Sequence, residues 1–262
     1  MKVGKYKFML NTTLRKNLEI IRDRAIPNKW DALFIIWGRE GVGKSTLATQ
    51  MAIFLDNKFS VKNIVFSAEQ FKEVIKNAKP ESTIIWDEAI TGANISQHAT
   101  EISSSIVSKM TQIRKKRLKI FLCFPYLYML NKYFVARSIA SIYIYAKAFD
   151  DRGYGLFYNS NQTEFLYNLM KFKYPYNYKG AINEAKISFH FRFKGKFCAN
   201  EKIYEAKKDK SIASATNKKG NLWKGRFIKL LDWNNKGLGK TWKEIAIAMD
   251  MNRTTIRDIA TS

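Results

Sequence analysis

Three glycines, a lysine and a serine lie close together in the segment GREGVGKS, residues 38–45. Their spacing matches G-x-x-x-x-G-K-[ST], a loop in which glycines let backbone amide groups turn inward around phosphate oxygens. We expect Lys44 to reach the β and γ phosphates of a nucleoside triphosphate and the Ser45 hydroxyl to ligate Mg²⁺. The sequence therefore predicts an ATP site made by Gly38, Gly41, Gly43, Lys44, Ser45 and Thr46.

Two acidic residues, Asp87 and Glu88, follow the apolar run STIIW. An aspartate that ends a strand beside a phosphate-binding loop can hold Mg²⁺ and its water shell, and a following glutamate can polarise the attacking water. We therefore predict that Asp87 joins Ser45 as a metal ligand, that Glu88 and Lys44 are catalytic, and that the protein is an ATPase. The alternative is a pair of solvated acids that open a loop, which would leave a nucleotide binder rather than a hydrolase.

A residue that senses the γ phosphate is expected after the next apolar run, LKIFLCFPYLY, and many such hydrolases use a polar residue there. Cys123 and Pro125 occupy that place in this sequence. Thr111 and Gln112, in the preceding helical segment, are alternative candidates. The sequence thus leaves the sensor unassigned.

A catalytic arginine that reaches the site of a neighbouring subunit is a further part of many such hydrolases. Arg137, in the segment YFVARSIAS, is our candidate for this catalytic role, and Arg114 and Arg117 are its rivals. Each of the three could instead be a solvated cation or contact DNA.

The C-terminal segment TWKEIAIAMDMNRTTIRDIA fits a helix-turn-helix, a common DNA-binding motif. Thr241 can cap the first helix, Asp250 takes the turn position that usually holds glycine, and Asn252 can cap the second helix. The residues that we expect to face bases and phosphates are Lys243, Arg253, Thr254, Thr255 and Arg257. An ordinary three-helix cap or a protein-binding module is the alternative.

Apolar runs and helical patterns alternate along the first two thirds of the chain. The runs are residues 31–38, 63–67, 82–88 and 118–124, and the helical patterns are residues 44–55, 68–78 and 98–117. Such alternation predicts an α/β fold with a mostly parallel sheet covered on both faces, in this case a RecA-like P-loop NTPase. The segment DDRGYG predicts a hairpin at the edge of the sheet, and KISFHFRFKGKFC alternates like a strand.

The domain organisation follows from these patterns. We expect an N-terminal extension with a helix at residues 1–29 and a P-loop ATPase domain with a C-terminal β-rich extension at residues 30–206. A lysine-rich linker at residues 207–220 then leads to a small all-α helix-turn-helix domain at residues 221–262.

The charge of the chain points to a polyanionic partner. There are 46 Lys and Arg against 22 Asp and Glu, which gives a formal net charge of +24 in 262 residues. DNA is the leading candidate, double-stranded first, and an anionic membrane surface is second. The segment KFKYPYNYK, residues 171–179, interleaves aromatic and basic residues that could stack single-stranded bases or form a surface ribbon.

Cysteine usage and hydropathy bound the cellular context. Cys123 and Cys198 are the only cysteines, and His98 and His190 are the only histidines, which argues against a disulfide scaffold and structural zinc. No apolar run approaches the roughly 18 residues that span a bilayer. We therefore expect a cytoplasmic protein without a membrane partner.

The P-loop, the WDEA strand end and the segment IRKKRLKIFLCFPYLYMLNKYFVARSIASIYIY together resemble the zonula-occludens-toxin-like and FtsK/HerA-type ATPases of phages, plasmids and archaeal viruses. The resemblance covers about residues 30–160. It implies a RecA-like core, ATP hydrolysis, assembly into a ring or filament, and action on DNA. The Thr-Gln usual after the fourth strand of those families is replaced here by Cys123, Phe124 and Pro125.

A partition ATPase of the ParA type is a weaker match. The segment REGVGKS differs from that family's KGGVGKS at two places, and Arg39 stands where the signature lysine is expected. WDEA is not that family's second motif.

These features predict a Mg-ATP-hydrolysing DNA-binding protein of a virus or mobile element, which acts as an oligomer, in the form of a ring, a filament or a dimer, in DNA replication, loading, packaging or translocation. The alternative function is an ATP-switched DNA-binding initiator or regulator, in which the nucleotide controls assembly and little motor activity exists.

Overall fold

The computed structural model describes residues 2–3, 6–87, 107, 109–148, 150–175, 177–194, 197, 199–211 and 213. The chain divides into two units, residues 1–208 and 209–262. The predicted helix-turn-helix and most of the predicted linker lie outside the described residues, so the fold below is that of the first unit.

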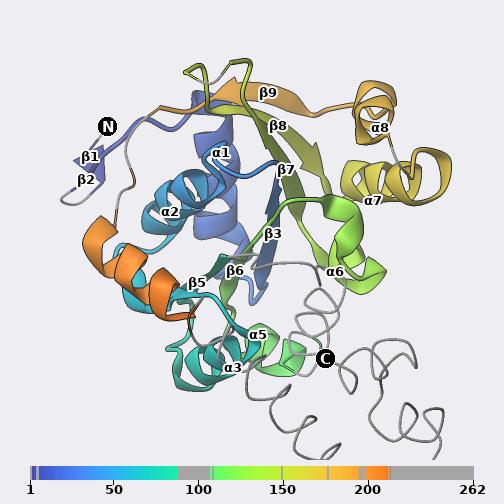
Figure 1. The fold of residues 1–262 in the computed structure, drawn as a ribbon. Helices are drawn as coiled ribbons and strands as arrows, with labels where there is room; N and C mark the ends of the chain where they lie inside the picture. The colour runs from blue at the N-terminus through green and yellow to red at the C-terminus, as the bar shows by residue number, and fades with distance from the viewer. Residues whose placement is uncertain are drawn as a thin grey trace, which may run out of the picture. The chain divides into compact units, whose positions relative to one another are not determined.

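An ordered series of strands and helices makes up this unit (Figure 1). The strands are β1 Lys2–Val3, β2 Tyr6–Lys7, β3 Ala32–Trp37, β4 Ile64–Val65, β5 Thr83–Asp87, β6 Lys119–Phe124, β7 Ala140–Tyr145, β8 Tyr154–Asn159 and β9 Phe189–Arg192. The α-helices are α1 Thr12–Ile20, α2 Lys44–Leu55, α3 Ala68–Asn77, α5 Met110–Lys115, α6 Lys132–Arg137, α7 Ser160–Asn168 and α8 Tyr178–Glu184. Short 3-10 turns are Val61–Asn63 and Leu127–Met129, and the π-helical turns Ile21–Ala25 and Leu169–Lys173 extend α1 and α7.

Seven strands form one mixed sheet in the order β4-β5-β6-β3-β7-β8-β9. The pairs from β4 to β7 are parallel, and the pairs β7–β8 and β8–β9 are antiparallel. The predicted α/β class with a mostly parallel sheet is therefore confirmed, and it is compatible with a P-loop NTPase. The predicted hairpin is β7–β8, but β9 adds outside it, so the hairpin is not the edge of the sheet.

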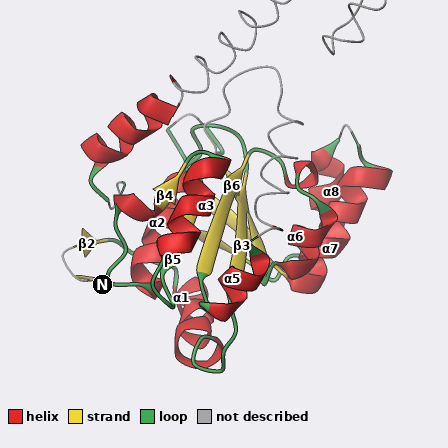
Figure 2. Cartoon of the chain, turned by 90° about the horizontal axis from the view of Figure 1, so that it is seen from below, coloured by secondary structure: helices red, strands yellow, loops and turns green. Residues whose placement is uncertain are grey.

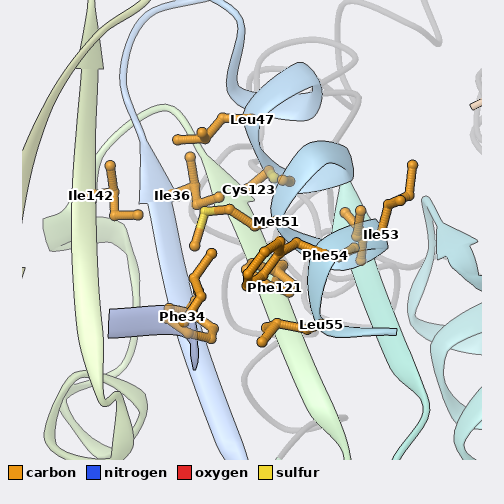
Figure 3. Close-up of a cluster of buried hydrophobic side chains, with 14 of the residues drawn as sticks. Phe34, Ile36, Leu47, Met51, Ile53, Phe54, Leu55, Phe121, Cys123 and Ile142 are labelled. Carbon is orange, nitrogen blue, oxygen red and sulfur yellow. The ribbon is translucent and has the colours of Figure 1, made fainter. Parts of the chain in front are cut away.

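Side chains of the parallel strands alternate between two cores because successive residues of a strand point to opposite faces. On one face, Phe34 and Ile36 of β3 and Phe121 of β6 pack against Leu47 and Met51 of α2, as Figure 3 shows. On the other face, the neighbouring residues of the same strands pack against α3, α5, α6 and α7. Helices thus cover both faces of the sheet (Figure 2).

Helix α2 is buried on all sides from Leu47 to Leu55. A helix without a polar face must lie inside a domain, and this one is enclosed by the sheet, α1 and the chain after β9. Its first turn is consequently held in a fixed position relative to the ends of β3 and β5.

Two smaller predictions can be compared directly with the structure. The helix expected in the N-terminal extension is α1, and Asn11 is its cap, since the Asn11 side chain accepts from the amides of Thr13 and Leu14. Residues 201–211 are helical, so the first five residues of the predicted linker, 207–211, belong to a helix. Among the described residues, no helix combines the length and the apolar character that crossing a bilayer requires.

Candidate functional site

The loop between β3 and α2 has backbone dihedrals that only glycine adopts readily. Gly38, Gly41 and Gly43 have φ values of 145°, 74° and 102°. A Cβ atom at Gly38 would lie 2.1 Å from the carbonyl oxygen of Ile144 in β7, whereas a Cβ atom at Gly41 would meet nothing within 4 Å. The first glycine is therefore required by close packing as well as by its dihedral, and the second by its dihedral alone.

The Lys44 ammonium is held inside this loop. Its Nζ donates to the carbonyl oxygens of Gly38 at 2.7 Å and Arg39 at 2.8 Å. The loop is braced from outside by Arg152, whose Nη1 donates to the Gly41 carbonyl at 3.1 Å. The loop thus already surrounds a positive charge.

The first turn of α2 presents backbone amides without a side-chain cap. Gly43 is the N-cap residue in a left-handed conformation, and it has no side chain with which to cap this turn. The amide groups at a helix N-terminus attract anions, because they lack intrahelical partners and carry the positive end of the helix dipole. The residues present therefore fit a phosphate group.

The order of the strands sets the distance between the two predicted motifs. β6 lies between β3 and β5, and its Cys123 pairs with Ile36 on one side and Asp87 on the other. Neighbouring strands are about 4.8 Å apart, so the end of β5 lies roughly 10 Å from the end of β3. Helix α2, whose first turn includes Ser45, packs on the face of the sheet over these strands.

Asp87 is buried, with 6 % of its surface exposed, and its carboxylate has a tyrosine partner. The Tyr204 hydroxyl donates to Asp87 Oδ2 at 2.6 Å. The Ser45 side chain also lies next to the Tyr204 hydroxyl, and it acts to lower the pKa of Tyr204. Burial, followed by the charge of Asp87, raises the pKa of Tyr204 far above its ordinary value of 10.0, so this hydroxyl keeps its proton at neutral pH.

The predicted metal ligands, Ser45 and Asp87, are thus brought together through one hydroxyl group. Oxygen atoms of a serine and one carboxylate fit Mg²⁺, which typically uses one or two protein ligands together with substrate phosphates and water. In the described part of the chain, no group of three or more His, Cys, Asp or Glu side chains could hold a metal ion. The oxygen chemistry around Ser45 and Asp87 therefore fits a cation that is shared with a phosphate ligand.

Cys123 occupies the expected sensor position. It is 1 % exposed and lies between the ends of β3 and β5. Burial, with a smaller contribution from Asp87, raises the pKa of the Cys123 thiol well above its ordinary value. The thiol therefore stays neutral. The alternative candidates Thr111 and Gln112 are exposed on α5, which precedes the opposite, amino end of β6.

Arg137 does not join the phosphate loop of its own chain. It ends α6, just before the amino end of β7, and its Nη2 donates to Asp31 Oδ2 at 2.9 Å. Asp31 directly precedes β3, whereas the loop follows that strand. The two groups thus lie at opposite ends of β3.

The remaining predicted residues cannot be placed. Glu88 and the predicted DNA-contacting residues Lys243, Arg253, Thr254, Thr255 and Arg257 lie outside the described residues.

In the segment KFKYPYNYK, Lys173 and Tyr174 both hydrogen-bond to Glu184 of α8, which favours the surface-ribbon interpretation of these two side chains.

Tyr204 is the residue of this site that the sequence did not reveal. Asn200 signals a helix start, and its side chain accepts from the Ile203 amide at 3.2 Å. That signal could have predicted a helix in residues 201–208. Nothing local indicates that the helix docks 117 residues away in sequence, beside Asp87.

A protein-family model, described as Novel STAND NTPase 3, matches residues 29–137. This range includes the glycine-rich loop, Asp87 and Arg137. No curated protein and no solved structure matches the chain. The match supports an NTPase domain in this part of the chain, and nucleotide hydrolysis in general terms; it supports neither the zonula-occludens-toxin-like or FtsK/HerA-type families nor the C-terminal helix-turn-helix.

Proposed function

We propose that the chain is a Mg-ATP hydrolase that acts on DNA. The observation that carries the enzymatic part is the loop of positive-φ glycines between β3 and the uncapped start of α2, with Asp87 two strands away. The NTPase family match over the same residues supports it independently.

In this proposal the loop residues Gly38, Gly41, Gly43, Lys44 and Thr46 bind the phosphates, and Ser45 and Asp87 hold Mg²⁺. Lys44 then exchanges at least one of its bonds to the carbonyl oxygens of Gly38 and Arg39 for a phosphate oxygen. Bound Mg²⁺ supplies positive charge that offsets the negative charge of the phosphate oxygens. Glu88 orients the attacking water.

The assignment to DNA rests on charge and on sequence. A net charge of +24 attracts a polyanion, and the helix-turn-helix pattern of residues 221–262 offers duplex contacts through its arginines and threonines. Ring or filament assembly, a viral or mobile-element origin, and kinship with the zonula-occludens-toxin-like and FtsK/HerA-type ATPases belong to the same proposal.

ATP turnover tests the enzymatic part. We expect Lys44→Ala to lower turnover by about 100-fold or more, because it removes a cation that faces the charge developing on the phosphate. Lys58→Ala is the matched control, since Lys58 is an exposed lysine at the far end of α2 from the loop. Glu88→Gln should lose turnover and keep nucleotide binding. Turnover that survives Lys44→Ala would contradict the proposal.

DNA binding is tested with the full chain and labelled duplex. Affinity should fall steeply between 50 and 200 mM salt, by a factor of about 10³ for six or more phosphate contacts. The double variant Arg253→Ala/Arg257→Ala should weaken binding without changing turnover in the absence of DNA. Salt-insensitive binding would contradict the DNA assignment.

A further inference from the structure

The hydroxyl of Tyr204 lies between the two groups assigned to the metal. It donates to Asp87 Oδ2 at 2.6 Å, and the Ser45 side chain lies next to it. The tyrosine side chain is 5 % exposed and Asp87 is 6 % exposed, so this contact is closed to bulk water. The Tyr204 hydroxyl thus occupies the space beside both Asp87 of β5 and Ser45 of α2.

The tyrosine ring is held by a small aromatic group of its own. Its ring centroid lies 4.5 Å from that of Phe197 and 5.5 Å from that of Phe66. One turn further along the helix, the Lys207 ammonium donates to the carbonyl oxygens of Val61 at 3.4 Å and Lys62 at 3.3 Å. Residues three apart share one face of a helix, so Tyr204 and Lys207 attach the same face of segment 201–208 to the unit.

The opposite face of this helical segment makes little contact. Glu201, Lys202, Ile203, Glu205 and Ala206 are all exposed. The segment, orange in Figure 1, is consequently attached to the unit through one face, so local opening can release it.

A hydroxyl in this position competes with a hydrated cation. Mg²⁺ binds oxygen at about 2.0–2.1 Å and keeps several waters, which would donate to the Asp87 carboxylate. Oxygens joined by hydrogen bonds lie about 2.7 Å apart, so the Tyr204 oxygen takes the space of the cation or of one of its waters. It also takes the Asp87 lone pair that such a water needs.

We propose that Tyr204 is a displaceable plug of the metal site, and that the helical segment 201–208 must withdraw before Ser45 and Asp87 can hold Mg²⁺. This inference rests on the proposed function for the identity of the metal site. It makes segment 201–208 an autoinhibitory element that keeps the site from binding a metal until the segment withdraws.

Removal of the hydroxyl alone is the first test. Tyr204→Phe keeps the ring and its packing and leaves Asp87 and Ser45 open to a cation. With Mn²⁺ as a paramagnetic substitute for Mg²⁺, we expect electron paramagnetic resonance titrations of the full chain to give about tenfold tighter binding than in the wild type, both with and without ATP. The factor corresponds to a typical hydrogen bond to a charged group.

Tyr174→Phe is the matched control. The Tyr174 hydroxyl donates to the Glu184 carboxylate at 2.8 Å, so the variant deletes the same kind of hydrogen bond elsewhere in the unit. It should leave the affinity for Mn²⁺ unchanged. Unchanged affinity in Tyr204→Phe would overturn the proposal, and weaker affinity would overturn it by making Tyr204 a residue that supports the metal ligands.

Amide hydrogen exchange of the wild-type chain gives a second test that needs no variant. Residues 201–208 should exchange faster in Mg²⁺ with a non-hydrolysable ATP analogue than with the same analogue in EDTA. Equal or slower exchange would overturn the plug.

The plug and the proposed function fail in different ways. Tighter Mn²⁺ binding by Tyr204→Phe, without any turnover that depends on Lys44, would support the plug and remove the ATPase assignment. Turnover that depends on Lys44, with metal affinity unaffected by Tyr204→Phe, would keep the ATPase and remove the plug.

Discussion

The two ends of strand β3 carry a cation each, and they hold it differently. At the carboxyl end, Lys44 is bound by two backbone carbonyls of a glycine loop. At the amino end, Arg137 is bound by the carboxylate of Asp31, whose side chain is 10 % exposed. The carbonyl groups that hold Lys44 carry no net charge, so its ammonium remains available to a phosphate. The carboxylate of Asp31, in contrast, already neutralises Arg137 within the fold.

The same contrast appears in the backbone. The carboxyl end is built from glycines in conformations that other residues adopt at a cost, and one of them touches a neighbouring strand. The amino end has a lysine, Lys119, whose Nζ caps the last carbonyl of α2, Leu55 O, at 3.1 Å. Glycine adopts these conformations without strain, so the cost would fall only on a residue that replaced it.

The largest effect should come from Gly38→Ala. The new Cβ would lie 2.1 Å from Ile144 O, so β7 or the loop must shift in addition to the dihedral strain. We expect a loss of more than about 2 kcal/mol in the free energy of unfolding. Gly41→Ala is the matched control, with left-handed strain of about 1 kcal/mol and no clash. Urea unfolding followed by circular dichroism measures both, and equal losses would show that the approach to β7 imposes no constraint.

Loss of the ion pair between Arg137 and Asp31, at the amino end of β3, should lower the free energy of unfolding by a smaller amount. Arg137→Ala and Asp31→Asn both remove the ion pair, whose charged atoms lie 2.9 Å apart, and each should cost about 1–2 kcal/mol of stability. A double-mutant cycle in urea should show that the two losses are not additive.

The same pair of variants decides the role of Arg137. If Arg137 only anchors the fold, turnover per folded molecule should be unchanged in both variants at temperatures well below their melting points. A loss of turnover in Arg137→Ala but not in Asp31→Asn would instead show that Arg137 acts in the site of a neighbouring subunit.

The smallest effect concerns Lys119 and pH. Burial lowers the pKa of Lys119 in the folded state below its ordinary value of 10.5, and this outweighs the opposing charges of Asp56 and Glu81. Between the lowered pKa of the folded state and the ordinary pKa of the unfolded chain, Lys119 binds a proton more often in the unfolded chain. The free energy of unfolding therefore rises with pH in this range, and the loss caused by burial of the charge disappears as pH approaches 10.5. In urea unfolding from pH 8 to 10.5, the free energy of unfolding of the wild type should therefore increase relative to that of Lys119→Met. A difference in free energy of unfolding that does not change with pH would contradict the lowered pKa of Lys119.

Much of the sheet follows from local pattern. The continuous apolar runs that became β3, β5 and β6 indicate strands buried on both faces, and the glycine spacing at residues 38–43 indicates the loop after β3. Helix α2 runs from Lys44 to Leu55, as the sequence predicts. These features depend on residues close together in the chain, where propensity and turn chemistry act directly.

Other features depend on partners distant in sequence. Arg137 fits an arginine finger by its place after β6, but its partner Asp31 is 106 residues away. The end of segment 201–208 lies in a run that also suits a polar linker, and the docking of Tyr204 beside Asp87 fixes the place of the segment in the fold. Neither pairing has a local signal.

The sequence alone determines the glycine-rich loop, because the positions of its glycines, a lysine and a helix start are encoded within eight consecutive residues. The folded chain determines which charges that loop can use. Arg137 is held away from it by an ion pair, and Asp87 is covered by a tyrosine from the end of the unit. The physical reason is that access to a charged group depends on which side chains pack against it, and packing brings together residues that the chain keeps far apart.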